Sequence, residues 1–166
     1  MRFLALTAVL ALALASAASA GKPTIVTEQV DETFIGAIDC GTVALDQRVV
    51  GVVKVRSFFA NGELTRELST FRLKQTFTNP VTGASLRSPD VGMDKLTVHE
   101  DGSATLMIVG IVVRVVVPGE GLVAGRNGQL RLFFESPDDM DPDVLLATGH
   151  QDTDEALDAA LCEALA

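Results

Sequence analysis

Apolar and polar residues alternate along much of this chain. In the segment 71–78 the apolar residues occupy odd positions, while charged residues such as Arg72 and Lys74 occupy even ones. Alternation of this kind is typical of a strand with one buried face. A second stretch, 104–117, is almost wholly apolar and rich in β-branched residues, which favours a strand over a helix. The chain is therefore predicted to be mainly β.

Turn-forming dipeptides separate the predicted strands. Asn61-Gly62, Asp101-Gly102 and Asn127-Gly128 are typical of tight hairpin turns, because these residues tolerate positive φ angles. About eight to ten antiparallel strands are expected, at 23–30, 32–38, 42–59, 63–79, 84–88, 92–100, 103–117, 121–126, 129–135 and 143–149. Because closure protects the edges of a long meander, the prediction is an antiparallel β-barrel bent at Gly51 and Gly110, with a β-sandwich as the alternative.

The C-terminal segment has a different period. Leu157, Leu161 and Leu165 recur every four residues, which predicts a short amphipathic α-helix over 154–165. Either Asp152 or Thr153 can cap its N-terminus.

Two cysteines, Cys40 and Cys162, are present. In an oxidising compartment they allow one intramolecular pairing, and the sequence has no C-x-x-C motif or clustered His that would indicate redox or metal chemistry. A structural disulfide that pins the helix to the sheet is therefore expected.

Residues 1–20 have the pattern of a secretory signal peptide. Arg2 is followed by an apolar run from Phe3 to Leu14 and by the small residues Ala18-Ser19-Ala20. The apolar run of about 12 residues is shorter than the roughly 20 that a membrane-spanning helix needs. Cleavage near Ala20 is expected to release a secreted, extracellular protein in which 21–166 form a single domain.

Composition narrows the classes of partner. The formal net charge is −9, and it becomes −10 without Arg2, so the acidic chain is expected to be a poor partner for nucleic acid or anionic membranes. The absence of Trp and Tyr disfavours carbohydrate binding and an outer-membrane barrel. Arg66, Arg72 and Lys74 form a modest basic stripe, which we interpret as a mixed charged face because Glu63 and Glu67 are close in sequence.

Candidate chemistry is sparse. His99 and His150 are the residues suited to act as bases near neutral pH, and no G-x-S-x-G motif accompanies them. His99 is interpreted as a solvated strand residue. His150 is a candidate ligand-binding residue, although a carboxylate such as Asp152 can also pair with it only to hold the junction before the helix.

Arg114 is the second ligand-binding candidate, because it is the one charge within 104–117. Three alternatives remain open for it: an interior ion pair, an anion anchor inside a barrel cavity, or an outward-facing side chain. No catalytic residue is assigned.

The acidic segment 138–143 matches only part of a calcium-binding loop. Asp139, Asp141 and Asp143 have the first spacing of such a loop, but Val144 and His150 occupy the positions that require Gly and Glu. A solvated turn is expected, with no metal and no cofactor.

Several turn and strand residues resemble a known group of proteins. They are Thr78-Asn79-Pro80, Thr82-Gly83, Asp101-Gly102, Thr105, Gly110, Arg114, Pro118-Gly119, Gly121, Gly125, Gly149-His150, Leu161-Cys162 and Leu165. The pattern resembles an uncharacterised group of small secreted β-rich proteins from actinobacteria that have a Cys pair. Departures are Ala84, where a polar residue often stands, and the short turn at Glu100-Asp101-Gly102. The resemblance implies secretion, a β-rich fold and a Cys pair, and it implies no activity.

The sequence thus predicts an exported, non-enzymatic β-barrel that binds a small apolar ligand or a protein partner. The alternatives are a structural or interaction domain of the cell envelope and, third, a cyclase- or isomerase-like enzyme that uses a barrel cavity. No membrane insertion is expected, and the oligomeric state is left open.

Overall fold

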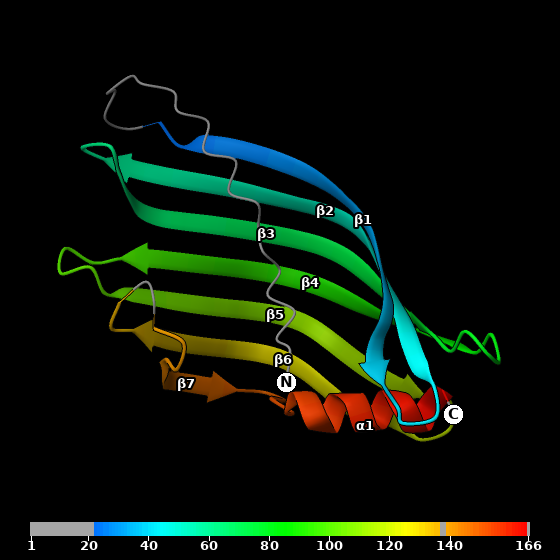
Figure 1. The fold of residues 1–166 in the computed structure, drawn as a ribbon. Helices are drawn as coiled ribbons and strands as arrows, with labels where there is room; N and C mark the ends of the chain where they lie inside the picture. The colour runs from blue at the N-terminus through cyan, green and yellow to red at the C-terminus, as the bar shows by residue number, and fades with distance from the viewer. Residues whose placement is uncertain (1–21, 137–138, 166) are drawn as a thin grey trace.

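The computed structural model describes residues 22–136 and 139–165, so the segment 1–20, predicted to be a signal peptide, lies outside the described residues. The elements are β1 (Thr24–Asp39), β2 (Ala44–Ala60), β3 (Glu63–Thr78), β4 (Ser85–Val98), β5 (Ala104–Val117), β6 (Gly121–Phe134), β7 (Asp143–Thr148) and α1 (Asp154–Leu165). Each strand pairs antiparallel with the next, which gives one sheet in the order β1 to β7 (Figure 1).

The predicted β-rich fold is confirmed, but the strands are fewer and longer than expected. The breaks predicted near residue 31 and at 89–91 do not occur, because β1 and β4 run through them. The hairpin turn predicted at Asn127-Gly128 is wrong: these residues lie within β6 and pair with Ile111 and Gly110 of β5. The turns predicted at Asn61-Gly62 and Asp101-Gly102 are confirmed.

The predicted closure into a barrel is also wrong. All seven described strands belong to one open sheet, with β1 and β7 at its two edges. β7 has 6 residues against 16 in β1, and the chain then leaves the sheet to form α1. The helix contacts β1 as well as β4, β5 and β6. It therefore fills one end of the space that a closed barrel would enclose.

The hydrophobic core lies at the end of the sheet that α1 covers. The predicted helix 154–165 and its buried stripe of Leu157, Leu161 and Leu165 are confirmed. These leucines pack with side chains from β1, β2, β3, β5 and β6, namely Ile38, Leu45, Phe77, Val113, Val115 and Ala124. Figure 1 shows the end of β1 and the start of β2 bending down to α1. Among the described residues, no helix has the length and apolar character required to cross a membrane.

The predicted disulfide between Cys40 and Cys162 is confirmed, with 5.5 Å between their Cα atoms. It joins the residue after β1 to α1 across a sequence separation of 122 residues. In the chain-entropy view, a link that closes so long a loop stabilises the fold by up to about 4–5 kcal/mol. A disulfide of this kind fits an extracellular protein.

A row of glycines crosses the sheet where the core ends. Gly92 of β4 pairs with Gly110 of β5, and Gly110 pairs with Gly128 of β6. A Cβ atom on Gly110 would collide with the carbonyl oxygen of Val91. The neighbouring backbones approach too closely for any side chain here, which agrees with the bend predicted at Gly110. We use this glycine row as the boundary between the part of the sheet near α1 and the rest.

Candidate functional site

The two faces of the sheet carry different side chains. We call the face on which α1 packs the inner face, and the opposite one the outer face. Successive residues of a strand point to opposite faces, so the register assigns the odd positions of β3 and the even positions of β4 and β6 to the inner face. The buried residues Leu73 and Phe77 of β3 and Ala124 of β6 follow this rule.

Only part of the inner face is covered by α1. In line with the glycine row and beyond it lies a group of apolar side chains that we call the open inner face: Val53, Val55, Phe71, Leu96, Leu106, Ile108, Leu130 and Leu132. Each of them keeps part of its surface exposed, whereas Leu45 and Val115 beneath α1 are fully buried. Within the described ranges, no helix or second sheet covers this half.

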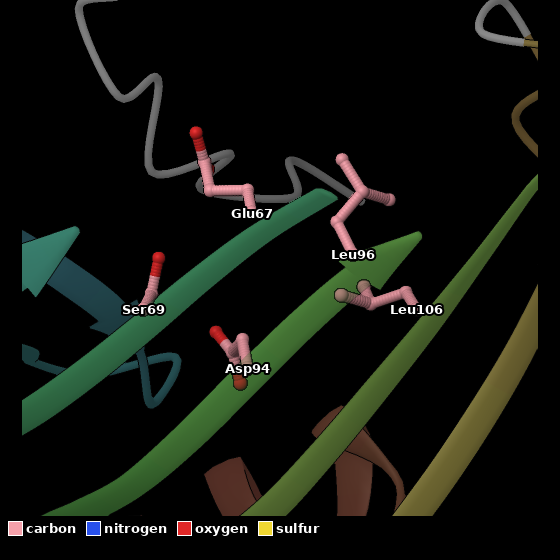
Figure 2. A pocket seen from close by; sticks show the side chains of 5 residues that line it. All are labelled: Glu67, Ser69, Asp94, Leu96 and Leu106. Atoms are coloured by element: carbon pink, nitrogen blue, oxygen red, sulfur yellow. The ribbon is translucent and has the colours of Figure 1, made fainter. Parts of the chain in front are cut away.

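A shallow pocket of about 210 Å³ lies on the open inner face (Figure 2). Its lining comes from three neighbouring strands: Glu67 and Ser69 of β3, Asp94 and Leu96 of β4, and Leu106 of β5. Two leucines therefore stand beside two carboxylates. Such a surface suits an apolar group that also carries a cation or a hydrogen-bond donor.

Asp94 is the polar group of this pocket that lacks a partner. Its Oδ1 atom is buried and accepts no hydrogen bond from the described residues. Burial raises the pKa of this carboxyl to about 6, because removal from water disfavours its charged form. A buried acceptor without a donor is costly, so a bound group that donates to Asp94 gains from that contact.

A second carboxylate, Asp90, lies near the boundary with the core and has a different environment. Gln75 Nε2 donates to Asp90 Oδ2 at 3.1 Å and to the Val112 carbonyl at 3.0 Å. Gln75 Oε1 in turn accepts from Gln47 Nε2 at 2.9 Å. Burial raises the pKa of Asp90 to about 6, against the opposing effect of the Gln75 hydrogen bond. These contacts bind strands to one another, which indicates a structural role.

The outer face is basic. Its Lys and Arg side chains are Arg48, Lys54, Arg56, Arg66, Arg72, Lys74, Arg87, Lys95, Arg114 and Arg131. Among the described residues, the ion pair found for this set joins Arg48 to Asp31 at 3.0 Å. Glu67, which the sequence places beside this stripe, points to the inner face instead. The mixed charged face expected from the sequence is therefore more basic than its local composition indicates.

Arg114 lies on the outer face, away from the pocket. Val113 and Val115 are buried against α1, so strand alternation turns Arg114 to the other side. Its backbone N–H donates to Ser88 Oγ at 2.7 Å. The side chain is half-buried, and within the described part of the chain it forms no ion pair and lines neither pocket. Of the three alternatives for Arg114, this geometry favours the outward-facing one.

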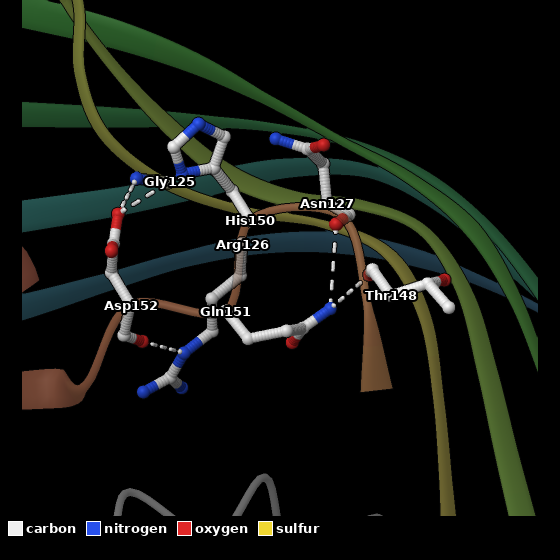
Figure 3. Close-up of polar contacts among 7 residues, drawn as sticks. All are labelled: Gly125, Arg126, Asn127, Thr148, His150, Gln151 and Asp152. Carbon is white, nitrogen blue, oxygen red and sulfur yellow. Dashed lines mark hydrogen bonds and ion pairs between the residues drawn. The ribbon is translucent and has the colours of Figure 1, made fainter. Parts of the chain in front are cut away.

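His150 lies at the junction between β7 and α1 (Figure 3). Its Nδ1 atom is 3.8 Å from Asp152 Oδ2, and its side chain is 60% exposed. Asp152 Oδ2 also accepts the Gly125 N–H at 2.8 Å, and the Asp152 carbonyl accepts from Arg126 Nε at 2.7 Å. These contacts tie β6 to the segment that precedes the helix. Asp152 is thus bonded to β6, and Thr153 caps the helix by accepting the Ala156 N–H.

His99 is exposed near the end of β4, with its Nε2 atom 2.9 Å from Thr105 Oγ1. It lines neither of the two pockets, and the same holds for His150. The structure therefore brings none of the residues suspected of chemistry together with Asp90 or Asp94.

The acidic segment forms a second pocket of about 320 Å³, lined by Glu135, Ser136, Asp139, Asp141 and Asp143. Asp139 is engaged within the turn, since its carboxylate accepts the backbone N–H groups of Glu135 and Asp141. Across 22–136 and 139–165, no group of three or more His, Cys, Asp or Glu side chains has the geometry to hold a metal ion.

Sequence reasoning missed Asp94, which is the most distinctive polar residue of the open inner face. The sequence did contain an indication of this position. Asp90 and Asp94 have even numbers, like Leu86 and Leu96 of the same strand, so all four side chains point to the same face. Charged residues in phase with the buried face of a strand often mark a site. The expected strand break at 89–91 hid this phase relation.

No protein-family model matches this chain, and neither curated proteins nor solved structures yield a match.

Proposed function

We propose that this is an exported, non-enzymatic binding protein whose open inner face receives an amphipathic helix of a partner protein. The observation that carries the proposal is the contrast between the two halves of the inner face. One half is buried beneath α1, and the other has the same kind of apolar side chains without a covering layer among the described residues. Domains are normally built from at least two packed layers, so a single apolar layer invites a partner.

The helix α1 shows what this face accommodates. It packs on the inner face through leucines four residues apart, in the pattern expected for one stripe of an amphipathic helix. The strands have 14–17 residues from β2 to β6, or roughly 45–55 Å at about 3.3 Å per residue. A helix of 12 residues is about 18 Å long. The sheet therefore leaves room for a second helix beyond the glycine row.

The carboxylates of the open inner face define the charge of the partner. Glu67 and Asp94 flank the apolar side chains, and Ser57 Oγ donates to Glu67 at 2.9 Å. Desolvation of these carboxylates by an apolar partner is costly unless the partner supplies donors. A helix with leucine-like residues on one stripe and Lys or Arg at its margins fits this surface.

The other functions considered from the sequence have less support. The inner pocket of about 210 Å³ is smaller than the roughly 300–1,000 Å³ of typical small-molecule sites. The larger pocket is lined by acidic and polar residues, so it does not suit an apolar ligand. The enzyme alternative required His99, His150 or Arg114 to line a pocket with carboxylates, and none of them lines either of the two pockets described above. Export is supported by the signal-like sequence of 1–20, by the disulfide and by the resemblance to secreted actinobacterial proteins.

The test uses a synthetic amphipathic Leu/Lys helix of about 18 residues, with binding measured by calorimetry at physiological salt. Leu96→Gln, in the pocket, is expected to weaken binding at least about tenfold, because it removes apolar contact worth about 1.5–3 kcal/mol. Met93→Gln is the matched control, since Met93 lies on the outer face of the same strand and is also half-buried.

Two results would overturn the proposal. One is equal weakening by Leu96→Gln and Met93→Gln in proteins whose circular dichroism matches the wild type. The other is equal affinity for a scrambled Leu/Lys peptide that cannot form one apolar stripe, which would show attraction between net charges alone.

A further inference from the structure

We propose that the basic outer face docks this protein on a surface of anionic phospholipid headgroups. This inference concerns the face opposite to the open inner face, and it does not depend on the proposed partner helix. It differs from the expectation, drawn from net charge, that the chain is a poor partner for anionic membranes.

Charge is segregated between the faces of the sheet. Twelve of the 13 Lys and Arg residues follow residue 21, and ten of these lie on the outer face. Few strand carboxylates share that face, and Asp31 among them is engaged by Arg48. The remaining acidic residues lie mainly in turns, in α1 and on the inner face. A molecule of net charge −9 thus presents one strongly basic face.

Within the outer face, cations alternate with apolar side chains. Neighbouring strands place Arg56, Leu68, Lys95, Met107 and Arg131 in one row across β2 to β6, each paired with the next. Strands lie about 4.8 Å apart, so cations recur roughly every 10 Å with an apolar side chain between them. The other cations lie in rows on either side, so the basic residues form a two-dimensional field rather than a single line.

Exposed apolar side chains on the outer face favour a lipid surface over other anionic partners. Ile25 and Val91 are 54% and 42% exposed, and the register places both on this face. A soluble phosphate polymer offers them no apolar environment. At the boundary between headgroups and acyl chains, cations contact phosphates while apolar side chains enter the outer edge of the hydrocarbon. The docking is peripheral: the seven described strands stay paired in one sheet, and only side chains of the outer face contact the lipid.

The experiment is flotation of the mature, disulfide-bonded protein with vesicles of about one-third phosphatidylglycerol in phosphatidylcholine, compared with pure phosphatidylcholine. Binding is expected to the anionic vesicles alone and is expected to fall steeply with added salt. A triple variant, Arg56→Gln, Lys95→Gln and Arg131→Gln, is expected to lose at least about tenfold in affinity. Lys95→Gln alone is expected to weaken binding more than Lys22→Gln, which removes the same charge outside the strands.

Three outcomes would overturn the inference: no flotation with anionic vesicles, equal flotation with pure phosphatidylcholine, or an unchanged affinity in the triple variant. Soluble polyphosphate that binds as tightly as the vesicles and displaces the protein from them would assign the face to a polyanion instead. An acidic peptide that does the same would assign it to a protein. The single variant Lys95→Gln keeps the test valid if the triple variant fails to fold.

Discussion

Two aspartates on opposite faces of the sheet show how position decides the ionisation of a carboxyl group. Burial raises the pKa of Asp94 to about 6. Asp31 is exposed and bonded to Arg48, and this hydrogen bond lowers its pKa below the usual 3.8. The inner face therefore disfavours a bare negative charge, while the outer face stabilises one through its cations.

The raised pKa of Asp94 gives a pH-dependent stability with a definite sign. The unfolded carboxyl has a pKa near 3.8, so between about pH 4 and 6 the folded protein binds more protons and loses stability as pH rises. Asp94→Asn is expected to raise the free energy of unfolding at pH 7.5 by about 1 kcal/mol, a value reduced for partial exposure. At pH 3.5 the effect should nearly vanish, and urea unfolding at the two pH values measures the difference.

Asp31→Asn is the control of opposite sign. The pKa of Asp31 is lowered in the folded state, so its contribution is present above about pH 3.8 and is lost as pH falls through the folded value. This substitution should therefore destabilise the protein at pH 7.5 but not in strong acid. If Asp94→Asn destabilises at pH 7.5, or acts equally at both pH values, the account of the inner face is wrong.

At the scale of elements, the sequence correctly predicted those elements that are determined by interactions between residues close together in the chain. The helix 154–165 is confirmed because its stripe and its cap both lie within a few residues of one another. The strand break near Pro89 failed because the pairing of β4 with β5 begins only at Val91. A missing N–H on the unpaired side of a strand costs no ladder hydrogen bond. Which side of β4 is unpaired at Pro89 depends on the register between strands, and no local sequence pattern contains that register.

The glycine row gives the element-scale prediction. Gly110→Ala is expected to destabilise the fold by at least about 2 kcal/mol more than Gly102→Ala. Both glycines have a positive φ angle, but a Cβ on Gly110 meets the Val91 carbonyl, whereas nothing lies within 4 Å of a Cβ on Gly102. Chemical denaturation of the two variants makes the comparison, and equal losses would mean that the strands at Gly110 can separate without cost.

At the scale of the whole molecule, the sequence indicated the fold class and the disulfide but not the closure of the sheet. Closure depends on whether β1 can reach the last strand, and α1 occupies the end of that space. The net charge of −9 likewise did not indicate how the charged side chains are distributed over the two faces of the sheet. Only the register of β2 to β6 reveals that cations such as Arg56 and Lys95 share one face while Asp94 lies on the other. Net charge describes solubility and not the location of binding surfaces.

The open inner face is proposed to be the binding face of the whole molecule. The most direct measurement is photo-crosslinking with the amphipathic Leu/Lys peptide, with a photoreactive leucine analogue on its apolar stripe, followed by peptide mapping by mass spectrometry. We expect crosslinks to inner-face residues of β4 and β5, such as Leu96, Leu106 and Ile108. Crosslinks concentrated on outer-face residues such as Met93 and Met107, or spread equally over both faces, would contradict this proposal.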